Sequence, residues 1–199
     1  MGWSVHAAGG LVETLGNGRF SAVILAVPAP QAVPLAASSG VALPELESVR
    51  YAPCWALMLG FSPPPGLCGD RIRPDDDVIA WIARDGSKPG RASETETVVV
   101  HAAPEWSRRN LERAADAVAH DILARFRDIT GISARPCFSA AHRWRHALVE
   151  RAAGPAFLWH EGARLGACGD WCLGPRVEAA FDSGEALADA ILATGVRWI

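Results

Sequence analysis

The stretch from Cys168 to Gly184 contains the residues best suited to hold a ligand. Its sequence, CGDWCLGPRVEAAFDSG, predicts a strand end, a glycine-containing turn and the start of a helix. Glycine lets a ligand approach the backbone, and a helix start carries unpaired N–H groups and partial positive charge. Asp170 adds a carboxylate there, and Pro175 suits the first position of the helix. From spacing alone, an ordinary strand, turn and helix with a solvent-exposed Asp170 is the alternative.

A second cluster, from His142 to His146, places two imidazoles, one indole and two guanidinium groups in five consecutive residues. On a strand, His142, Trp144 and His146 share one face and the two arginines share the other. Such a strand could form a pocket wall, because Trp offers a stacking surface and Arg pairs with anions. The alternative is a half-exposed strand with solvated arginines. On a helix the two histidines could bind zinc, but no acidic third ligand lies nearby in the sequence.

The remaining reactive residue types suggest no further site. The five cysteines form an odd set without an export signal, which predicts reduced thiols in the cytoplasm. Cys168 and Cys172 have neither the redox nor the zinc-ribbon spacing, so they are expected to be small apolar side chains. Ser183 lacks the G-x-S-x-G motif of serine hydrolases. The acidic run 75–77 lacks the later ligands of a calcium loop and is expected to be a solvated turn. We predict no metal site.

The composition excludes several classes of protein. Of the 199 residues 50% are hydrophobic and 21% are charged, which is typical of a globular chain. The net charge of −3 gives no reason to expect nucleic acid or an anionic membrane surface as a partner. No apolar run reaches the roughly 18 residues that a membrane helix needs. The first residues lack the basic start and apolar core of a signal peptide.

The pattern of apolar residues predicts a mixture of strands and helices. Residues 31–50 are predicted to be a helix or loop, and the clearest helix is predicted over 104–127, with an apolar stripe at three- and four-residue steps. Strands are predicted over 3–7, 11–15, 20–27, 51–61, 78–83, 97–102, 139–149 and 156–160. The fold class is therefore α/β (α+β). The order suggests that the chain leaves one α/β layer, builds a second domain and returns.

Four segments, PCWALMLGF, VVVHAAPEWSRR, AAHRWRHA and GACGDWCLGPRVEAAFDSG, together resemble the bacterial renalase-like branch of the flavin-containing amine oxidases. VILAVPAPQA is similar to the strand and proline turn that join the FAD domain of that family to its substrate domain. The resemblance extends from about Trp3 to Ile191. It implies a partial FAD-binding α/β layer in residues 1–30 and 163–199. It also implies a substrate domain in residues 31–162, with a mixed, largely antiparallel sheet and a long helix.

The resemblance implies roles for five residues of the stretch 168–184, which we call the C-terminal turn. Asp170 would bond a ribityl hydroxyl of FAD, and Gly169 and Gly174 would let the cofactor approach the backbone. The backbone N–H groups near Arg176 and Val177 would face N1 and the C2 carbonyl of the flavin. This assignment is physically reasonable because reduced flavin gathers negative charge there and a helix start stabilises it.

The resemblance also implies an activity. Family members oxidise a small reduced substrate, of the dihydronicotinamide or amine type, and pass electrons from the flavin to oxygen. His142 and Trp144 would lie on the substrate side of the flavin. We expect no catalytic protein residue, because the cofactor carries the hydride chemistry.

The sequence departs from this family at the pyrophosphate-binding motif. The family begins with a strand, G-x-G-x-x-G and a helix, and the sequence contains no such unit. We therefore expect a truncated or split chain that needs a separate N-terminal FAD-domain segment as its partner and is inactive alone. The alternative is a non-catalytic binding module, similar to a substrate domain, that binds no cofactor.

Overall fold

The computed structural model describes Trp3, residues 20–91 and residues 94–194. The chain divides into one unit made of Met1–Arg50 with Val149–Ile199 and a second unit made of Tyr51–Leu148. The predicted strands 3–7 and 11–15 lie outside the described residues, apart from Trp3. The chain passes from the first unit into the second and back, and the predicted domain bounds of 1–30 with 163–199 and 31–162 stay predictions. The assignment of FAD-binding and substrate roles to the predicted domains stays a prediction.

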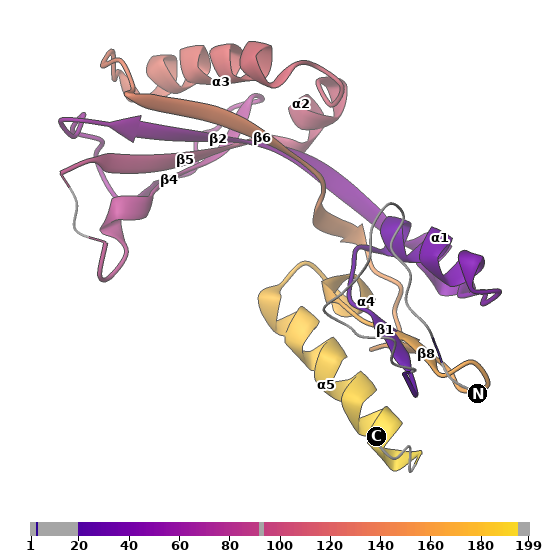
Figure 1. Cartoon of the computed structure of the whole chain (residues 1–199). Coiled ribbons are helices and arrows are strands. Elements are labelled where there is room, and N and C mark those ends of the chain that lie inside the picture. The colour runs from indigo at the N-terminus through magenta and orange to yellow at the C-terminus, as the bar shows by residue number, and fades with distance from the viewer. Residues whose placement is uncertain (1–2, 4–19, 92–93, 195–199) are drawn as a thin grey trace. The chain divides into compact units, whose positions relative to one another are not determined.

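A five-stranded sheet forms the framework of the second unit, in the order β3-β4-β5-β2-β6 (Figure 1). The pairs β3–β4, β4–β5 and β5–β2 are antiparallel. The predicted long strands are confirmed, and only β3 falls in a segment where no strand was predicted. The strands are β2 (Arg50–Phe61), β3 (Arg71–Ile72), β4 (Ile79–Arg84), β5 (Glu96–Ala102) and β6 (Phe138–Arg151).

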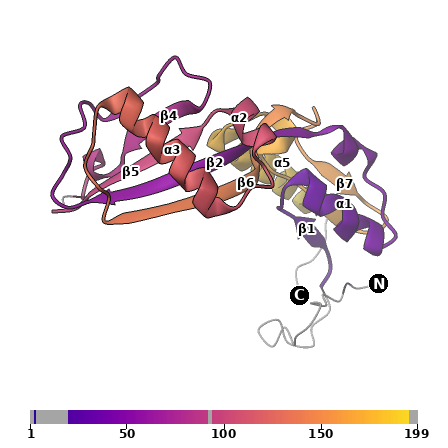
Figure 2. The same ribbon diagram turned by 90° about the horizontal axis from the view of Figure 1, so that it is seen from above.

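Helix α3 (Ala115–Thr130) covers one face of this sheet (Figures 1 and 2). Val118, Ile122 and Phe126 are fully buried, as their four-residue spacing predicts. They pack with alternate residues of β2 and β5, and the ring of Phe126 stacks on that of Phe61 at 6.3 Å. The helix ends at Gly131, whose φ of 72° suits glycine. Every second side chain of β2 and β5 therefore points to the core on the α3 face, and the side chains between them lie on the opposite face of the sheet.

The single helix predicted over 104–127 is wrong, because two helices form there. Helix α2 (Pro104–Arg109) ends before a break, and α3 begins at Ala115. In the break, the guanidinium of Arg143 donates a hydrogen bond of 2.6 Å to the carbonyl oxygen of Leu111. The indole Nε1 of Trp55 also donates to the carbonyl oxygen of Asn110, at 3.1 Å. Two side chains of the sheet, distant in sequence, thus anchor the segment between α2 and α3.

The prediction of a solvated turn at the acidic run 75–77 is wrong for its central residue. The carboxylate of Asp76 accepts hydrogen bonds from the amides of Val78 (2.9 Å) and Ile79 (2.8 Å), and its side chain is only 4% exposed. It also accepts from Nε of Arg125 on α3, at 2.8 Å. Burial alone would raise the pKa of Asp76, but these hydrogen bonds hold it below its usual range. Asp76 therefore ties the start of β4 to α3.

A three-stranded sheet, in the order β1-β8-β7, forms the core of the first unit. The predicted strand 20–27 is shorter than expected, at β1 (Val23–Leu25). β1 pairs in parallel with β8 (Leu165–Ala167), which pairs antiparallel with β7 (Leu158–His160). Helix α5 (Val177–Ala193) packs on this unit through buried residues that include Leu187 and Ile191. This sheet therefore has one parallel and one antiparallel pair.

The segment after β1 is helical. Helix α1 (Ala29–Ser38) starts directly after Pro28 and buries Ala29, Ala32 and Ala36. The short 3-10 helix η2 (Pro44–Ser48) follows it, and a second one, η3 (Asp85–Ser87), follows β4 in the other unit. Among the described residues, no helix combines the length and apolar character needed to cross a membrane.

Candidate functional site

The C-terminal turn, residues 168–184, contains one short helix and the start of a second, where a single helix was predicted. A short helix, α4 (Asp170–Leu173), follows β8, and the Gly174 amide donates to the Asp170 carbonyl at 2.7 Å. Gly174 has φ +148°, which favours glycine, and α5 begins only at Val177. Pro175 thus lies before the N-cap, and its predicted position as the first helical residue is wrong.

Gly169 is required by packing. A Cβ atom at this position would lie 2.6 Å from Nε1 and 2.8 Å from Cδ1 of Trp171, which is fully buried. Trp171 donates through Nε1 to the carbonyl of Val27 at 3.2 Å. The Gly169 amide donates to Oγ of the buried Ser183 at 3.0 Å. The turn is therefore fixed on one side to the end of β1 and on the other to α5.

The start of α5 offers unpaired donors. Arg176 is the N-cap residue, and its side chain makes no capping hydrogen bond. Its own amide donates to the Gly174 carbonyl at 2.8 Å, so the predicted role of the Arg176 N–H is already satisfied within the turn. The amides of Val177 and the next two residues have no acceptor within the helix. With the helix dipole, they form a place where an electron-rich ligand atom could bind.

The turn also has room for a ligand. A Cβ atom at Gly174 would meet no atom within 4 Å. The Val177 side chain is 86% exposed, and Asp170 is half-buried. Of the predicted cofactor residues, Gly169, Asp170, Gly174, Arg176 and Val177 thus occupy one continuous turn of the first unit.

The two cysteines of this turn are buried free thiols. Burial raises the pKa of both Cys168 and Cys172. A thiol that stays protonated is a poor nucleophile and a poor metal ligand. They are therefore expected to act as small apolar side chains. No group of three His, Cys, Asp or Glu able to hold a metal occurs among the residues that the structure describes.

The predicted substrate residues His142 and Trp144 lie on β6 in the second unit. They share a face of the strand, and their rings meet edge to face at 4.6 Å. His146, on the same face, contacts the ring of Tyr51 at 5.2 Å. Trp144 is 55% exposed, so its indole offers a free surface for stacking.

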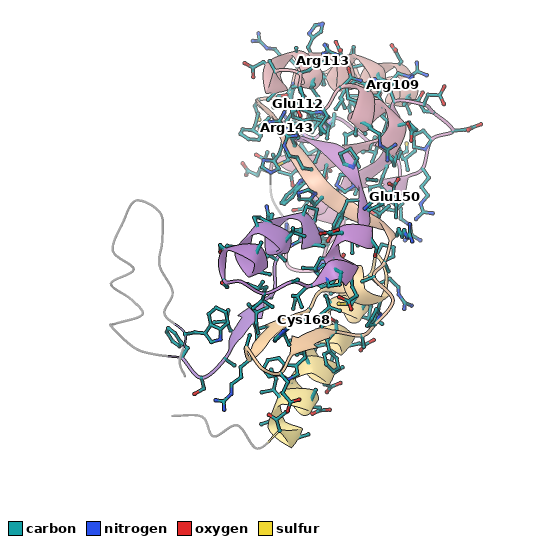
Figure 3. All side chains as sticks on the ribbon, turned by 90° about the vertical axis from the view of Figure 1, so that its right-hand side faces the viewer. Arg109, Glu112, Arg113, Arg143, Glu150 and Cys168 are labelled. Atoms are coloured by element: carbon teal, nitrogen blue, oxygen red, sulfur yellow. The ribbon has the colours of Figure 1, made fainter. Side chains whose placement is uncertain are left out.

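Arg143 and Arg145, which alternate with these residues on β6, form ion pairs, so the alternative of a strand with solvated arginines is wrong. Both Arg143 and Arg145 bind the carboxylate of Glu112, at 3.1 and 2.6 Å (Figure 3 shows Arg143 beside Glu112). The Arg143 guanidinium also lies 5.7 Å from the ring centroid of Trp55. These arginines hold the α2–α3 break against β6, and the two guanidinium groups share one carboxylate.

A cavity of about 660 Å³ opens on the same sheet, on residues of β2, β4, β5 and β6 and the start of α2. Its lining includes Trp144 but not His142, so only one of the two predicted substrate residues borders it. Sequence reasoning missed most of its other functional groups. Those groups, with Trp144, are Cys54, Trp81, His101 and His146.

The titratable groups of the cavity are held in their neutral forms. Loss of water lowers the pKa of His101, and the same effect, with the charge of Arg145, lowers that of His146. Burial raises the pKa of Cys54 to about 11, although a weak hydrogen bond to the Ala102 carbonyl partly opposes this effect. The cavity can therefore bind a ligand by stacking and hydrogen bonds, and it lacks an activated nucleophile.

The fold matches those of several solved oxidoreductases. One is a protein from Exiguobacterium sp. 255-15, provisionally assigned as a protoporphyrinogen oxidase, with a TM-score of 0.66 and 18% identity over 89% of this chain. Putrescine oxidase matches with a TM-score of 0.60 and 16% sequence identity over 87% of this chain. An FAD-dependent oxidoreductase from Pseudomonas aeruginosa matches with a TM-score of 0.56 and 14% sequence identity over 91% of this chain. No protein-family model matches the sequence.

The likeness establishes the fold, which is of the type found in FAD-dependent oxidoreductases. The chain spans 42%, 43% and 47% of the lengths of these three structures, in the same order. It therefore corresponds to less than half of each of these proteins.

Proposed function

We propose that this chain is part of an FAD-dependent oxidoreductase of the renalase-like amine oxidase type, and that the Cys168–Gly184 turn holds the flavin end of the cofactor. The observation that carries the proposal is the uncapped start of α5 beside Gly174. A flavin needs hydrogen-bond donors where its reduced form gathers negative charge, and a helix start supplies them. The similarity of the fold to those of flavin enzymes supports this choice.

The residues of the turn would divide the binding of FAD between them. The Asp170 carboxylate would accept a hydrogen bond from a ribityl hydroxyl, and the Val177 amide would donate to the pyrimidine edge of the flavin. Gly169 and Gly174 would keep the backbone free of side chains on this path. When bound, FAD supplies hydride acceptance and electron transfer to oxygen. Trp144 and His142 would orient a small reduced substrate, of the dihydronicotinamide or amine type.

A partner segment would complete the site. Val177, Phe181 and Leu192 form an apolar stripe on α5 (yellow in Figure 1) and are 86%, 68% and 59% exposed. Exposed apolar surface of this kind marks a surface that another element covers. We propose that a separate FAD-domain segment, with the strand–GxGxxG–helix unit, covers this stripe and binds the pyrophosphate. This chain covers only 42% and 43% of two of the similar structures, which supports the proposal.

A comparison of FAD with riboflavin tests this function. If the chain holds only the flavin and ribityl end, the two ligands should bind the purified chain with Kd values within about threefold of each other. Quenching of flavin fluorescence measures both. FAD binding more than about tenfold tighter would contradict the division of the site, because the pyrophosphate would then have a partner in this chain. Binding of neither ligand would favour the cofactor-free binding module.

The free cysteines fit our proposal that the protein works in the reducing cytoplasm.

A further inference from the structure

The cavity of the second unit has a chemical character that narrows the choice of its ligand. It lies on the face of the sheet opposite the core, where His101 and Cys54 alternate with the buried residues of β5 and β2. In the strand register Trp81 pairs with His101, so their side chains are neighbours on this face. Trp144 and His146 come from β6. Four aromatic rings from three strands therefore border one space.

The cavity carries no formal charge of its own near neutral pH. None of its lining residues is Asp, Glu, Lys or Arg. The lowered pKa values of His101 and His146 keep both imidazoles uncharged. A ligand with an ammonium group would lose hydration on entry without meeting a carboxylate.

Aromatic rings can bind cations, but the surroundings of this cavity oppose that use. The guanidinium of Arg73 already lies 4.9 Å from the ring centroid of Trp81. The charge of Arg145 reaches His146, whose pKa it helps to lower. Both effects make the potential near these rings positive, which disfavours a second cation.

The polar groups that remain suit an uncharged ring with hydrogen-bonding atoms. A neutral imidazole has one donor and one acceptor, so His101 and His146 can each bond either kind of ligand atom. The exposed indole of Trp144 can stack on a flat ligand face. The thiol of Cys54 stays protonated, so the cavity binds its ligand without a covalent bond.

We propose that this cavity binds an uncharged planar aromatic or heteroaromatic ring and selects against aliphatic or aromatic ammonium compounds. The role of that ring as the oxidised part of a substrate rests on the proposed flavin function, whereas its binding does not. Of the two substrate types that the proposed function leaves open, this preference disfavours the amine.

Two probes of nearly equal size test the charge preference. Benzyl alcohol is uncharged, and benzylamine carries the same ring with an ammonium group at neutral pH. Titration of the full chain, followed by saturation-transfer NMR, should give a Kd for benzylamine about tenfold higher than that for benzyl alcohol, or about 1.4 kcal/mol. Equal or tighter binding of benzylamine would overturn the proposal. So would the absence of benzyl alcohol binding at millimolar concentration.

Two variants and one control localise the binding. Trp144→Leu should weaken benzyl alcohol about fivefold, because the stacking surface is lost. His146→Gln keeps a donor and an acceptor and should change binding less than about twofold. Phe138→Leu removes an aromatic ring that is 56% exposed on the same strand but is not part of the cavity, so it should have no effect. An unchanged Kd in Trp144→Leu refutes the assignment. Riboflavin binding, measured separately, reports on the flavin function alone.

Discussion

Replacement of Gly169 by alanine tests whether the C-terminal turn is built as described. The added Cβ would lie 2.6 Å from Nε1 of Trp171, closer than any real Cβ contact. Trp171 cannot move aside at low cost, because it is 1% exposed and its Nε1 donates to the Val27 carbonyl. The amide of residue 169 would also shift away from Oγ of Ser183. The substitution therefore forces a change in a closely packed region.

The size of the effect follows from these contacts. Overpacking of a buried site costs about 1–3 kcal/mol, and loss of one buried hydrogen bond costs about 1 kcal/mol. We expect Gly169→Ala to lower the free energy of unfolding of the first unit by about 3 kcal/mol. Urea-dependent hydrogen exchange of α5 and β8 peptides, read by mass spectrometry, measures this unit separately from the other.

Gly184→Ala is the matched control. Gly184 lies inside α5, and a Cβ there would meet no atom within 4 Å. Alanine in a helix interior is favoured over glycine by about 1 kcal/mol, so this variant should be more stable than the natural chain. If Gly169→Ala is as stable as Gly184→Ala, the described packing of Trp171 on the turn is incorrect.

Two further predictions concern the second unit. Asp76→Asn should lower the free energy of unfolding of the second unit by about 2 kcal/mol in urea titrations at neutral pH. The control Asp75→Asn should lower it by less than about 0.5 kcal/mol. Folding lowers the pKa of Asp76, so the stabilisation by its carboxylate is complete above the unfolded pKa of about 3.9 and is lost as the pH falls through the folded pKa. The free energy of unfolding of Asp76→Asn should therefore depend less on pH in acid. Cys54 should react slowly with iodoacetamide at neutral pH and faster as the pH rises toward about 11, as peptide mass spectrometry can follow; rapid reaction at pH 7 would show that its thiol is not held protonated.

The apolar positions of α3 could be predicted because they follow from local periodicity. Val118, Ile122 and Phe126 recur at four-residue steps, and all three are buried. The break before α3 could not be predicted in this way. It depends on Trp55 and Arg143, which bond carbonyls 55 and 32 residues away in sequence. Tertiary contacts of this kind override a local pattern without leaving a sign in it.

The aromatic cavity shows the same limit. Trp144 could be predicted as a candidate from the density of functional groups around it. Trp81 and His101 belong to strands that were also predicted, but their meeting depends on the pairing of β4 with β5. Sequence alternation shows that each side chain lies on one face, yet it does not say which strands are neighbours.

The start of helix α5 differs from the prediction for a local reason, since the turn at Gly174 moves it to Val177.

The most direct test of the central claim is riboflavin binding by two carboxylate variants. Asp170→Ala removes the group proposed to bond the ribityl chain, whereas Asp182→Ala removes an exposed carboxylate farther along α5. A charge-assisted hydrogen bond is worth about 1.5–3 kcal/mol, so the Asp170 variant should bind riboflavin at least about tenfold more weakly, and the Asp182 variant should match the natural chain. Equal riboflavin affinity in all three proteins would contradict the claim that this turn holds the flavin.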